Sequence, residues 1–554
     1  MTTLGPARRS ESPSTALETL AVASVGAVAF AVLGARAIYQ AAGWLQHGHA
    51  PSLQGVGLVT FARALIRRPA NPAHGLPLSA QQHAPSAWLY LGLLGLAVLA
   101  LCVAGAAIVL KLNRRNPADD PQAGWMTARQ ARSLAVSGAV PGRIVLGTAR
   151  GQTIATEPEH SLLVFGPTRS GKTSRIAAPA IRSWTGPAIV VSTKTDLLHA
   201  TYGDRQQLGD VAIFDPTRAT GLPNAGWSPI LGALDPREAR RTADRFVRVA
   251  GTTDGLGAAF WTATAGQLLA PLLHAAALAG LTMRDVTRWV RTATLDEPAE
   301  ILRTHQQGEM AEAVETVHAQ EPRLRDSTLA TLRTVLAGYE DELAAESDVP
   351  EITGDWLLDG TNTLYVVGGS EDQRRLAPVF LALVGELTDA GYARAEERRR
   401  DTGDPRERLD PPLLLVLDEA ANMAPLPDLA TLASTAGGMG VQLLTLYQDR
   451  SQPRRIYGRD AVETVCNAHL AKLALGGITD TDTLGYFERL LGQRPETRRS
   501  TTRGPGGTTT TTSEQREPLL NTSHLRTLAT GEAVLAYAAR PPLRLSLPRA
   551  RSFK

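Results

Sequence analysis

The sequence predicts an α/β fold whose parallel sheet is interrupted by an all-α insertion and preceded by a membrane anchor of two helices. Three observations predict this arrangement. Short apolar runs that end in small or polar residues recur through the latter part of the 554-residue chain, as in strands buried on both faces. Helical spacing replaces them between about residues 231 and 355. Near the N-terminus, an uncharged stretch of 23 residues is long enough to cross a bilayer.

Composition sets wide limits on function. Hydrophobic residues make up 43% of the chain, which is enough for a packed core and excludes bulk disorder. The net charge of +3 permits nucleic-acid binding but does not by itself indicate it. The two cysteines exclude a disulfide framework and a Cys/His metal cluster. We therefore expect most of the chain to lie in a reducing, cytoplasmic compartment.

The second expected span covers residues 88–110. Its apolar run from Trp88 to Leu110 is followed at once by Lys111, Arg114 and Arg115, and basic residues mark the cytoplasmic flank of a span. The alternative is a buried helix of a soluble domain. The length of the run and its basic flank favour the span.

The first expected span covers residues 19–41, where the uncharged Leu20–Ala35 segment ends before Arg36. Arg36 could snorkel to the interface, and a cleaved signal peptide is the competing interpretation. Two spans place residues 42–84 outside and both chain ends in the cytoplasm. This orientation opposes the positive-inside tendency and is decided by the nucleotide motif further along the chain, which requires cytoplasmic ATP. The opposing residues in the outer loop are Arg63, Arg67 and Arg68.

A nucleotide-binding loop is predicted directly after the apolar strand Ser161–Phe165. The segment GPTRSGKT, residues 166–173, fits the pattern G-x-x-x-x-G-K-[ST], and a helical segment follows. Loop amides and the helix N-terminus can then face phosphate groups, Lys172 can neutralise phosphate charge and Thr173 can bind Mg²⁺. The expected nucleotide-contacting residues are Gly166, Pro167, Thr168, Arg169, Ser170, Gly171, Lys172, Thr173 and Ser174.

A second half of the site is predicted where the apolar run Leu413–Leu417 ends in Asp418 and Glu419. The carboxyl ends of parallel strands are where such sheets bind ligands. Asp418 would hold Mg²⁺, and Glu419 would orient or activate the attacking water. An ordinary acidic helix start is the alternative, but the upstream loop favours the catalytic interpretation. ATP and Mg²⁺ are therefore the expected cofactors.

Four more strands fit the same sheet. Gln448 follows the last of them and could sense the γ-phosphate or position water, although a strand-capping role explains it equally well. The strands are Ala188–Ser192, Val211–Phe214, Thr363–Val367 and Val441–Tyr447.

The expected domains follow from these patterns. Residues 1–115 form the anchor, residues 116–230 and 356–554 form the discontinuous P-loop ATPase domain, and residues 231–355 form the all-α insertion. Residues 496–516 are rich in Gly and Thr and are expected to be a flexible linker, whose arginines could also contact DNA phosphates. The stretch 519–548 returns to a strand pattern that would close the sheet.

With these elements in place, the chain resembles the type IV coupling proteins of the TraG/TraD type from about residue 160 to residue 490. Ser228 departs from the family's W-N-P segment, where an asparagine is usual. The stretches that carry the resemblance are GPTRSGKTS (166–174), VVSTKTDL (190–197), FDPT with GWSPI (214–217 and 226–230), FWTATAGQLLAPLLHAAAL (260–278) and LLLVLDEAANMAPLPDLATLASTAGGMGVQLLTLYQD (413–449).

The resemblance implies a cytoplasmic motor with a RecA-like core and an all-α domain. Together with the two expected spans, this predicts a multi-pass protein of the inner membrane whose ATPase domain lies in the cytoplasm. The resemblance also implies a homo-hexamer around a central channel that hands DNA with its bound relaxase to a type IV secretion channel and drives conjugative transfer by ATP hydrolysis. One departure is informative. Several members carry an arginine after the second acidic motif that reaches the neighbouring subunit's ATP, but residues 435–440 here contain none. Either another arginine does this job or hydrolysis is slow. The candidates are Arg374, Arg375, Arg450 and Arg454, and a solvated surface charge is the alternative interpretation of each.

Three other functions remain open at this stage. A DNA translocase of the FtsK class shares the motor, but we find no C-terminal winged-helix pattern. A receptor for secreted protein substrates needs the same motor, with DNA incidental, and direct DNA binding with a salt dependence would distinguish it. A catalytically silent scaffold is disfavoured by the intact Lys172, Thr173, Asp418 and Glu419.

Overall fold

The computed structural model describes residues 13–112, 124–248, 258–369, 371–419, 426, 429–504 and 507–548. It divides into two compact units, Met1–Pro117 and Ala118–Lys554. Each unit has its own hydrophobic core, so each is described by itself.

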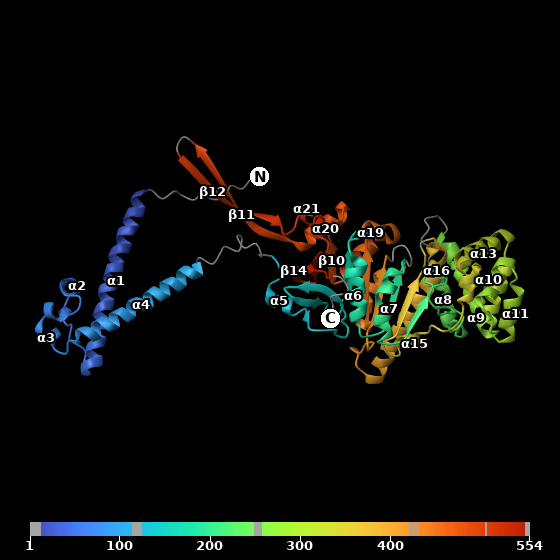
Figure 1. The fold of residues 1–554 in the computed structure, drawn as a ribbon, viewed down its shortest axis with the longest axis horizontal. Helices are drawn as coiled ribbons and strands as arrows, with labels where there is room; N and C mark the ends of the chain where they lie inside the picture. The colour runs from blue at the N-terminus through green and yellow to red at the C-terminus, as the bar shows by residue number, and fades with distance from the viewer. Residues whose placement is uncertain are drawn as a thin grey trace. The chain divides into compact units, whose positions relative to one another are not determined.

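The first unit consists of two long helices and a small cap between them (Figure 1). Helix α1 spans Pro13–His47 and α4 spans Ala87–Leu112. They meet through the rings of Tyr39 and Tyr90, whose centroids lie 5.9 Å apart. The cap is built from α2 (Leu58–Arg67), the 3₁₀ turn η1 (Pro72–Gly75) and α3 (Leu78–Gln81).

Among the described residues, α4 contains a segment, Ala87–Ala104, that is long and apolar enough to cross a membrane and is only 6% buried. The segment Arg375–Thr402 passes the same test but is 67% buried, because it packs inside the second unit. The expected first span lies within α1, but the side chains of residues 13–28 are outside the described part, so that span stays a prediction. Arg36, at the end of the uncharged segment, donates hydrogen bonds to the carbonyls of Val56 (2.6 Å) and Leu53 (3.1 Å).

A parallel sheet forms the centre of the second unit, and its strands lie in the order β10-β4-β9-β8-β5-β7-β6. Most of its residues are fully buried, as the continuous apolar runs predict. Its strands are β4 (Leu162–Phe165), β5 (Ala188–Ser192), β6 (Val211–Phe214), β7 (Thr363–Val367), β8 (Leu413–Asp418), β9 (Val441–Tyr447) and β10 (Ala471–Leu475).

Antiparallel strands extend the sheet beyond β10. Strand β13 pairs with β10, and β14 pairs with β13, so the C-terminal stretch joins the sheet as expected. It does not close the sheet, because β2, β3 and β1 continue it beyond β14. The segment before the nucleotide loop also joins the sheet, which the sequence patterns did not reveal. These strands are β1 (Ala135–Val136), β2 (Val145–Ala149), β3 (Gln152–Ala155), β13 (Glu532–Tyr537) and β14 (Arg540–Ser546).

Helices cover both faces of this sheet. Alternate residues of a strand point to opposite faces, so Leu163 and Phe165 contribute to one core while Leu162 and Val164 contribute to the other. The helices are α5 (Ala128–Arg132), α6 (Ala178–Ser183), α7 (Asp196–Gln206), α16 (Gln373–Thr402), α18 (Leu429–Met439), α19 (Ser451–Ala468), α20 (Thr481–Leu491) and α21 (Thr522–Arg526).

Between β6 and β7 the described chain is helical, without strands. This region packs directly on the sheet's core, since Trp227 contacts Phe214 on one side and stacks on Phe246 on the other, with both centroid distances 6.5 Å. Its elements are η4 (Gly232–Leu234), α8 (Pro236–Arg248), α9 (Ala258–Leu278), α10 (Met283–Thr292), α11 (Asp296–Thr304), α12 (Gly308–His318), α13 (Pro322–Leu336), η6 (Ala337–Glu340), α14 (Glu342–Glu346) and α15 (Gly354–Leu358).

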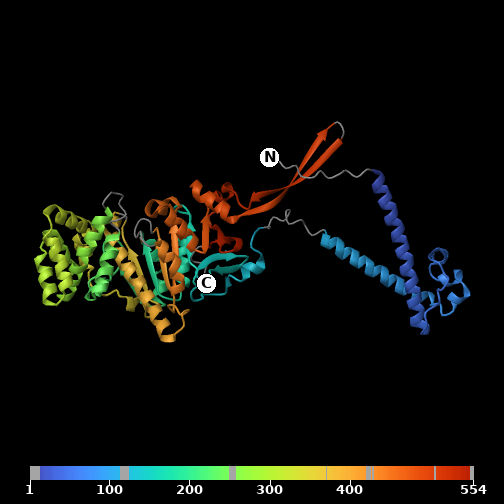
Figure 2. The same cartoon turned by 180° about the vertical axis from the view of Figure 1, so that it is seen from behind.

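The expectation of a linker at residues 496–516 is wrong. Strands β11 (Gln493–Gly504) and β12 (Gly507–Pro518) form an antiparallel ribbon apart from the main sheet (Figure 2). Their register runs from Gln493 opposite Pro518 to Gly504 opposite Gly507. Threonine is β-branched and favours extended backbone, so the threonine runs support strands where the Gly/Thr composition alone indicated a linker.

Candidate nucleotide site

Glycine is required at two positions of the loop that follows β4. A Cβ at Gly166 would lie 2.7 Å from the Ser170 hydroxyl and 2.8 Å from Leu475. Gly171 has a φ of +96°, a left-handed conformation that costs glycine little. Without a Cβ at these two positions the loop backbone can curl tightly, so that its amides can surround a phosphate group.

Lys172 and Thr173 begin the turn of π-helix, η3 (Lys172–Ala177), that follows the loop. The Lys172 ammonium is buried and donates to the carbonyls of Gly166 (2.5 Å) and Pro167 (3.1 Å). The Thr173 hydroxyl donates to Asp418 Oδ2 at 3.1 Å. This contact joins the loop to the end of β8, 245 residues later in the chain, and places a hydroxyl beside a carboxylate as an Mg²⁺ site requires.

Burial shifts the two principal charges of the site toward neutrality. It lowers the pKa of Lys172, and the nearby Asp418 and Glu419 carboxylates oppose that shift. It raises the pKa of Asp418 to about 6, against the opposing hydrogen bond from Thr173. Both shifts express the cost of holding a charge away from water, which an oppositely charged ligand would relieve.

Strand β9 lies between β4 and β8, so its end separates the loop from the acidic pair. Gln448 follows this strand, and its side-chain amide lies 3.5 Å from Glu419 Oε1, a weak hydrogen bond. Glu419 has a φ of +57°, unusual for a residue with a Cβ. The structure thus brings Lys172, Thr173, Asp418, Glu419 and Gln448 to one edge of the sheet.

The other predicted loop residues differ in exposure. Thr168, Arg169 and Ser174 are exposed, and Pro167 is half-buried. The Ser170 hydroxyl is buried without a hydrogen-bond partner among the described residues. A buried hydroxyl inside a loop of this shape fits a bound phosphate, since unpaired buried polar groups are costly.

The predicted site residues omitted three charged neighbours. Lys194 and Asp196 follow β5, which pairs with β8 so that Ser192 lies opposite Asp418. The charge of Lys194 acts on Lys172, and that of Asp196 acts on Asp418. Asp449, next to Gln448, also acts on Lys172. Their signal was present, because both segments directly follow predicted strands of the same sheet.

The candidate arginines are engaged within their own chain. Arg375 pairs with Asp341 (3.0 Å) and Asp372 (2.8 Å), while the side chain of Arg374 lies outside the described part. The other two, Arg450 and Arg454, both pair with Glu463 and Asp482. Arg450 is 1% exposed, so reaching a neighbouring subunit would require its buried guanidinium to leave both of these carboxylates.

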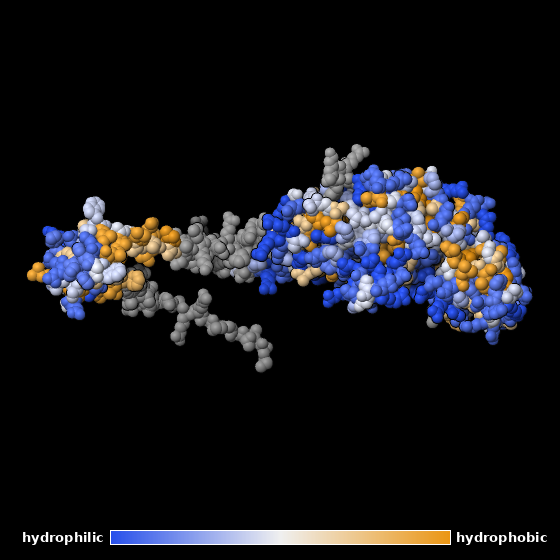
Figure 3. Space-filling view, turned by 90° about the horizontal axis from the view of Figure 1, so that it is seen from below, coloured by the Kyte–Doolittle hydropathy of each residue, from blue (hydrophilic) through white to orange (hydrophobic). Residues whose placement is uncertain are grey.

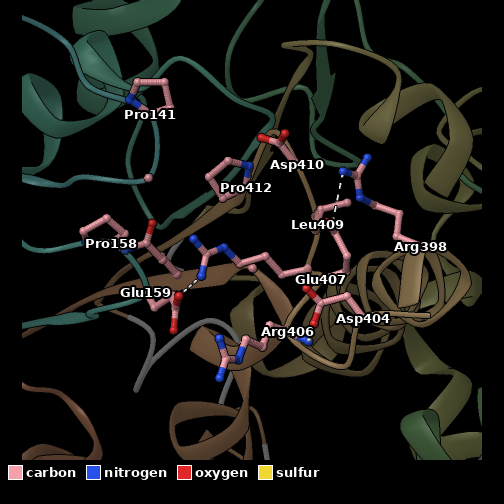
Figure 4. A pocket seen from close by; sticks show the side chains of 14 residues that line it. Pro141, Pro158, Glu159, Arg398, Asp404, Arg406, Glu407, Leu409, Asp410 and Pro412 are labelled. Atoms are coloured by element: carbon pink, nitrogen blue, oxygen red, sulfur yellow. Dashed lines mark hydrogen bonds and ion pairs between the residues drawn. The ribbon is translucent and has the colours of Figure 1, made fainter. Parts of the chain in front are cut away.

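A polar cavity of about 470 Å³ lies at the opposite edge of the sheet (Figure 4). Two ion pairs cross it, Arg408 with Glu159 and Arg398 with Glu407 (3.3 Å). Most of its lining residues precede β4, β8 or β9, so the cavity is separated from the nucleotide loop by the length of the strands. The lining residues are Pro141, Gly142, Pro158, Glu159, Arg398, Asp404, Arg406, Glu407, Arg408, Leu409, Asp410, Pro412, Gly440 and Gln442.

Comparison with known proteins gives this site its context. The family model described as "Type IV secretory system Conjugative DNA transfer" matches residues 123–553. The chain belongs to this family. The match covers most of the chain and includes the nucleotide loop, the acidic pair and Gln448, so the resemblance to type IV coupling proteins inferred from the motifs is confirmed.

Two conjugal transfer proteins TraG of Escherichia coli are similar in sequence. One is 25% identical over 372 residues, covering 61% of this chain, and the other is 26% identical over 349 residues, covering 56%. The chain spans about half the length of these relatives, 55% and 52%.

Solved structures of the conjugative coupling protein TrwB share the fold. The unbound form has a TM-score of 0.57 at 21% identity, covering 76% of this chain and 91% of that one. TrwB in complex with ADP and Mg²⁺ has a TM-score of 0.54 at 21% identity, covering 74% and 96%. The predicted fold class is confirmed by this likeness.

Proposed function

We propose that this chain is a membrane-anchored ATPase that couples a DNA–relaxase substrate to a type IV secretion channel and drives conjugative DNA transfer. The observation that carries the proposal is the convergence of Lys172, Thr173, Asp418, Glu419 and Gln448 on one edge of the sheet in a chain of this family.

In this proposal residues 166–174 bind the phosphates of ATP through backbone amides and the Lys172 ammonium. Thr173 and Asp418 hold Mg²⁺, whose charge offsets that of the phosphates when it is bound. TrwB has been solved in complex with ADP and Mg²⁺, which supports this cofactor assignment. The lowered pKa of Lys172 and the raised pKa of Asp418 are both restored toward normal by such a ligand, so binding energy is gained at each.

The hydrolytic step is assigned to Glu419 and Gln448. Glu419 orients or deprotonates the attacking water, a role that needs an ionised carboxylate near the phosphate. Gln448 holds the Glu419 carboxylate by its side-chain amide, at 3.5 Å, and positions the same water. Because Arg375, Arg450 and Arg454 are paired within the chain, none of them is assigned to a neighbouring site.

The organisation proposed for the chain has residues 1–115 as a multi-pass anchor in the inner membrane, with α4 as one span. Residues 116–230 and 356–554 form the cytoplasmic P-loop ATPase domain, and residues 231–355 form the all-α domain. The proposed partners are DNA, relaxase or relaxosome proteins and the secretion channel. A homo-hexamer is the proposed assembly.

The test is the ATPase rate of the full chain in nanodiscs, with and without DNA, across a salt series. We expect stimulation by DNA that declines steeply as salt rises, because phosphate contacts release counterions. Hydrolysis indifferent to DNA at every salt concentration would reject a DNA motor and favour a receptor for protein substrates.

A further inference from the structure

The cap between α1 and α4 carries positive charge without a balancing acid. No Asp or Glu occurs between Glu18 and Asp119. Arg63, Arg67 and Arg68 are exposed, and their side chains have no hydrogen bond or ion pair with any described residue. The charge that meets these arginines must therefore come from outside the described anchor unit.

Helix α2 presents two different faces. Phe61 and Ala64 are buried in the cap's core. On the other face Val59 is 65% exposed and Ile66 78% exposed. Val59, Arg63, Ile66 and Arg67 are spaced i, i+4, i+7 and i+8, so they share this outer face. Apolar and basic side chains therefore stand side by side on a helix surface that nothing in the described unit covers.

The surroundings of α2 are of the same kind. Trp44 and Leu45 near the end of α1 are each 59% exposed, Trp88 at the start of α4 is 87% exposed, and Leu78 is 80% exposed. Figure 3 shows apolar residues on the anchor unit next to hydrophilic ones. Exposed tryptophans beside a candidate span are typical of the membrane–water interface, so the apolar surface of the span continues onto the cap.

We propose that α2 binds the membrane surface, with Val59 and Ile66 entering the acyl boundary and Arg63, Arg67 and Arg68 contacting the phosphates of anionic phospholipids. An amphipathic basic helix of this kind lies in the interface plane, and each arginine gains from a negative surface. The inference rests on the proposed span α4. It also gives a reason for arginines on a side of the membrane where the positive-inside tendency disfavours them.

The experiment places a fluorescent probe on the outer face of α2 in the full chain. The variant Ile66→Cys is combined with Cys102→Ala, because Cys102 is exposed whereas Cys466 is buried. The NBD-labelled protein is reconstituted into vesicles of phosphatidylcholine alone or with phosphatidylglycerol. We expect the emission to shift to the blue and nitroxide-labelled lipid to quench it, with both effects greater when phosphatidylglycerol is present.

Arginine variants test the charge component. Replacing Arg63, Arg67 and Arg68 by glutamine should remove about half or more of the quenching gained from phosphatidylglycerol, since each arginine contributes near an anionic surface. The matched control replaces Arg129 and Arg132, which are exposed on α5 in the other unit, and should leave the quenching unchanged.

Two results would overturn the proposal. One is a probe whose emission shows that it stays in water in both kinds of vesicle. A probe that becomes buried only when a channel protein with an acidic surface is added would count as this result, because the helix would then bind a protein and not the lipid. The other is equal quenching in the triple variant and the parent. Flotation of the protein with the vesicles reports on the span, and the ATPase rate reports on the motor, so failure of the proposed function is recognised separately.

Discussion

The two edges of the parallel sheet carry similar numbers of charges but hold them differently. At the carboxyl edge, Lys172 and Asp418 are each 5% exposed, and burial shifts the pKa of both. At the amino edge, Arg408 and Glu159 pair with both side chains 42% exposed. Charge density therefore does not distinguish a site from a surface. The distinguishing property is charge kept out of water without full compensation, which is where ligands gain binding energy.

The topology explains this difference. Parallel strands direct the loops that follow them to one edge, where crevices form at the carboxyl ends. Strands β4, β8 and β9 all deliver their following residues to this edge. The loops that enter the same strands meet at the other edge, where Arg398 and Arg408 each find a carboxylate. Four substitutions test the contrast.

The largest effect is expected for Lys172→Ala. Removing the buried ammonium should lower the rate of phosphate release from ATP by at least about 100-fold, because a preorganised positive charge on the phosphates is lost. The control is the melting temperature without nucleotide. It should change little, because the substitution also removes the free-energy cost of burying the Lys172 charge. A variant that hydrolyses ATP within about threefold of the parent would contradict the assigned site.

The next effect is expected for Glu419→Gln. ATP affinity should stay within a few-fold, while turnover falls by about 100-fold or more, because a general base contributes that much. Nucleotide binding is measured by fluorescence titration and turnover by phosphate release. Glu407→Gln at the amino edge is the matched control and should retain normal turnover. Normal turnover in the Glu419 variant would remove this residue from its role.

Lys172 and Glu419 also show how much of the candidate site could be predicted from the sequence. The nucleotide loop and the acidic pair were predictable because each couples a residue pattern to a strand end. The strand order was not, since β9 follows β8 in the chain yet lies between β8 and β4. Only that order places Gln448 beside Glu419. Lys194 and Asp196 follow a predicted strand, but their proximity to Asp418 was missed because the apolar pattern of β5 does not show that it pairs with β8.

One wrong prediction and one missed set of contacts have physical causes. The ribbon β11–β12 was predicted as a linker because its glycine and low apolar content outweighed the strand preference of threonine. The contacts of Arg36 were missed because its partners, the Val56 and Leu53 carbonyls, belong to a cap that has no motif. In both cases the deciding contacts are made by backbone groups, which side-chain patterns do not report.

Asp418→Asn tests how much the buried negative charge of Asp418, at the carboxyl edge, lowers the free energy of unfolding. The pKa of Asp418 is about 6 in the folded chain and 3.8 in its reference state. The unfolded chain therefore releases this proton first, and the stability contributed by Asp418 is present below pH 4 and lost as pH rises through 6. The asparagine variant cannot titrate, so above pH 6 and without nucleotide it should be more stable by roughly 2–3 kcal/mol.

Thermal unfolding of parent and variant from pH 4.5 to 8 measures this difference. It should grow with pH and level off above pH 7. Addition of Mg²⁺ and ATP should stabilise the parent and have little effect on the variant, because the proposed metal ligand is lost. A difference in stability that is constant across the pH range would show that Asp418 is not held at a cost.

The smallest effect is expected for Arg408→Gln at the amino edge. Its pair with Glu159 is half exposed, and such pairs contribute at most about 1 kcal/mol. A double-mutant cycle with Glu159→Gln should give a coupling energy of about 1 kcal/mol or less, and turnover should stay within about twofold. A tenfold loss of turnover in the Arg408 variant would contradict the proposed difference between the two edges. It would mean that the exposed pair at the amino edge affects the carboxyl edge through the strands. Unchanged turnover beside the Lys172 result would show that the burial of charge, and not its presence, separates the two edges.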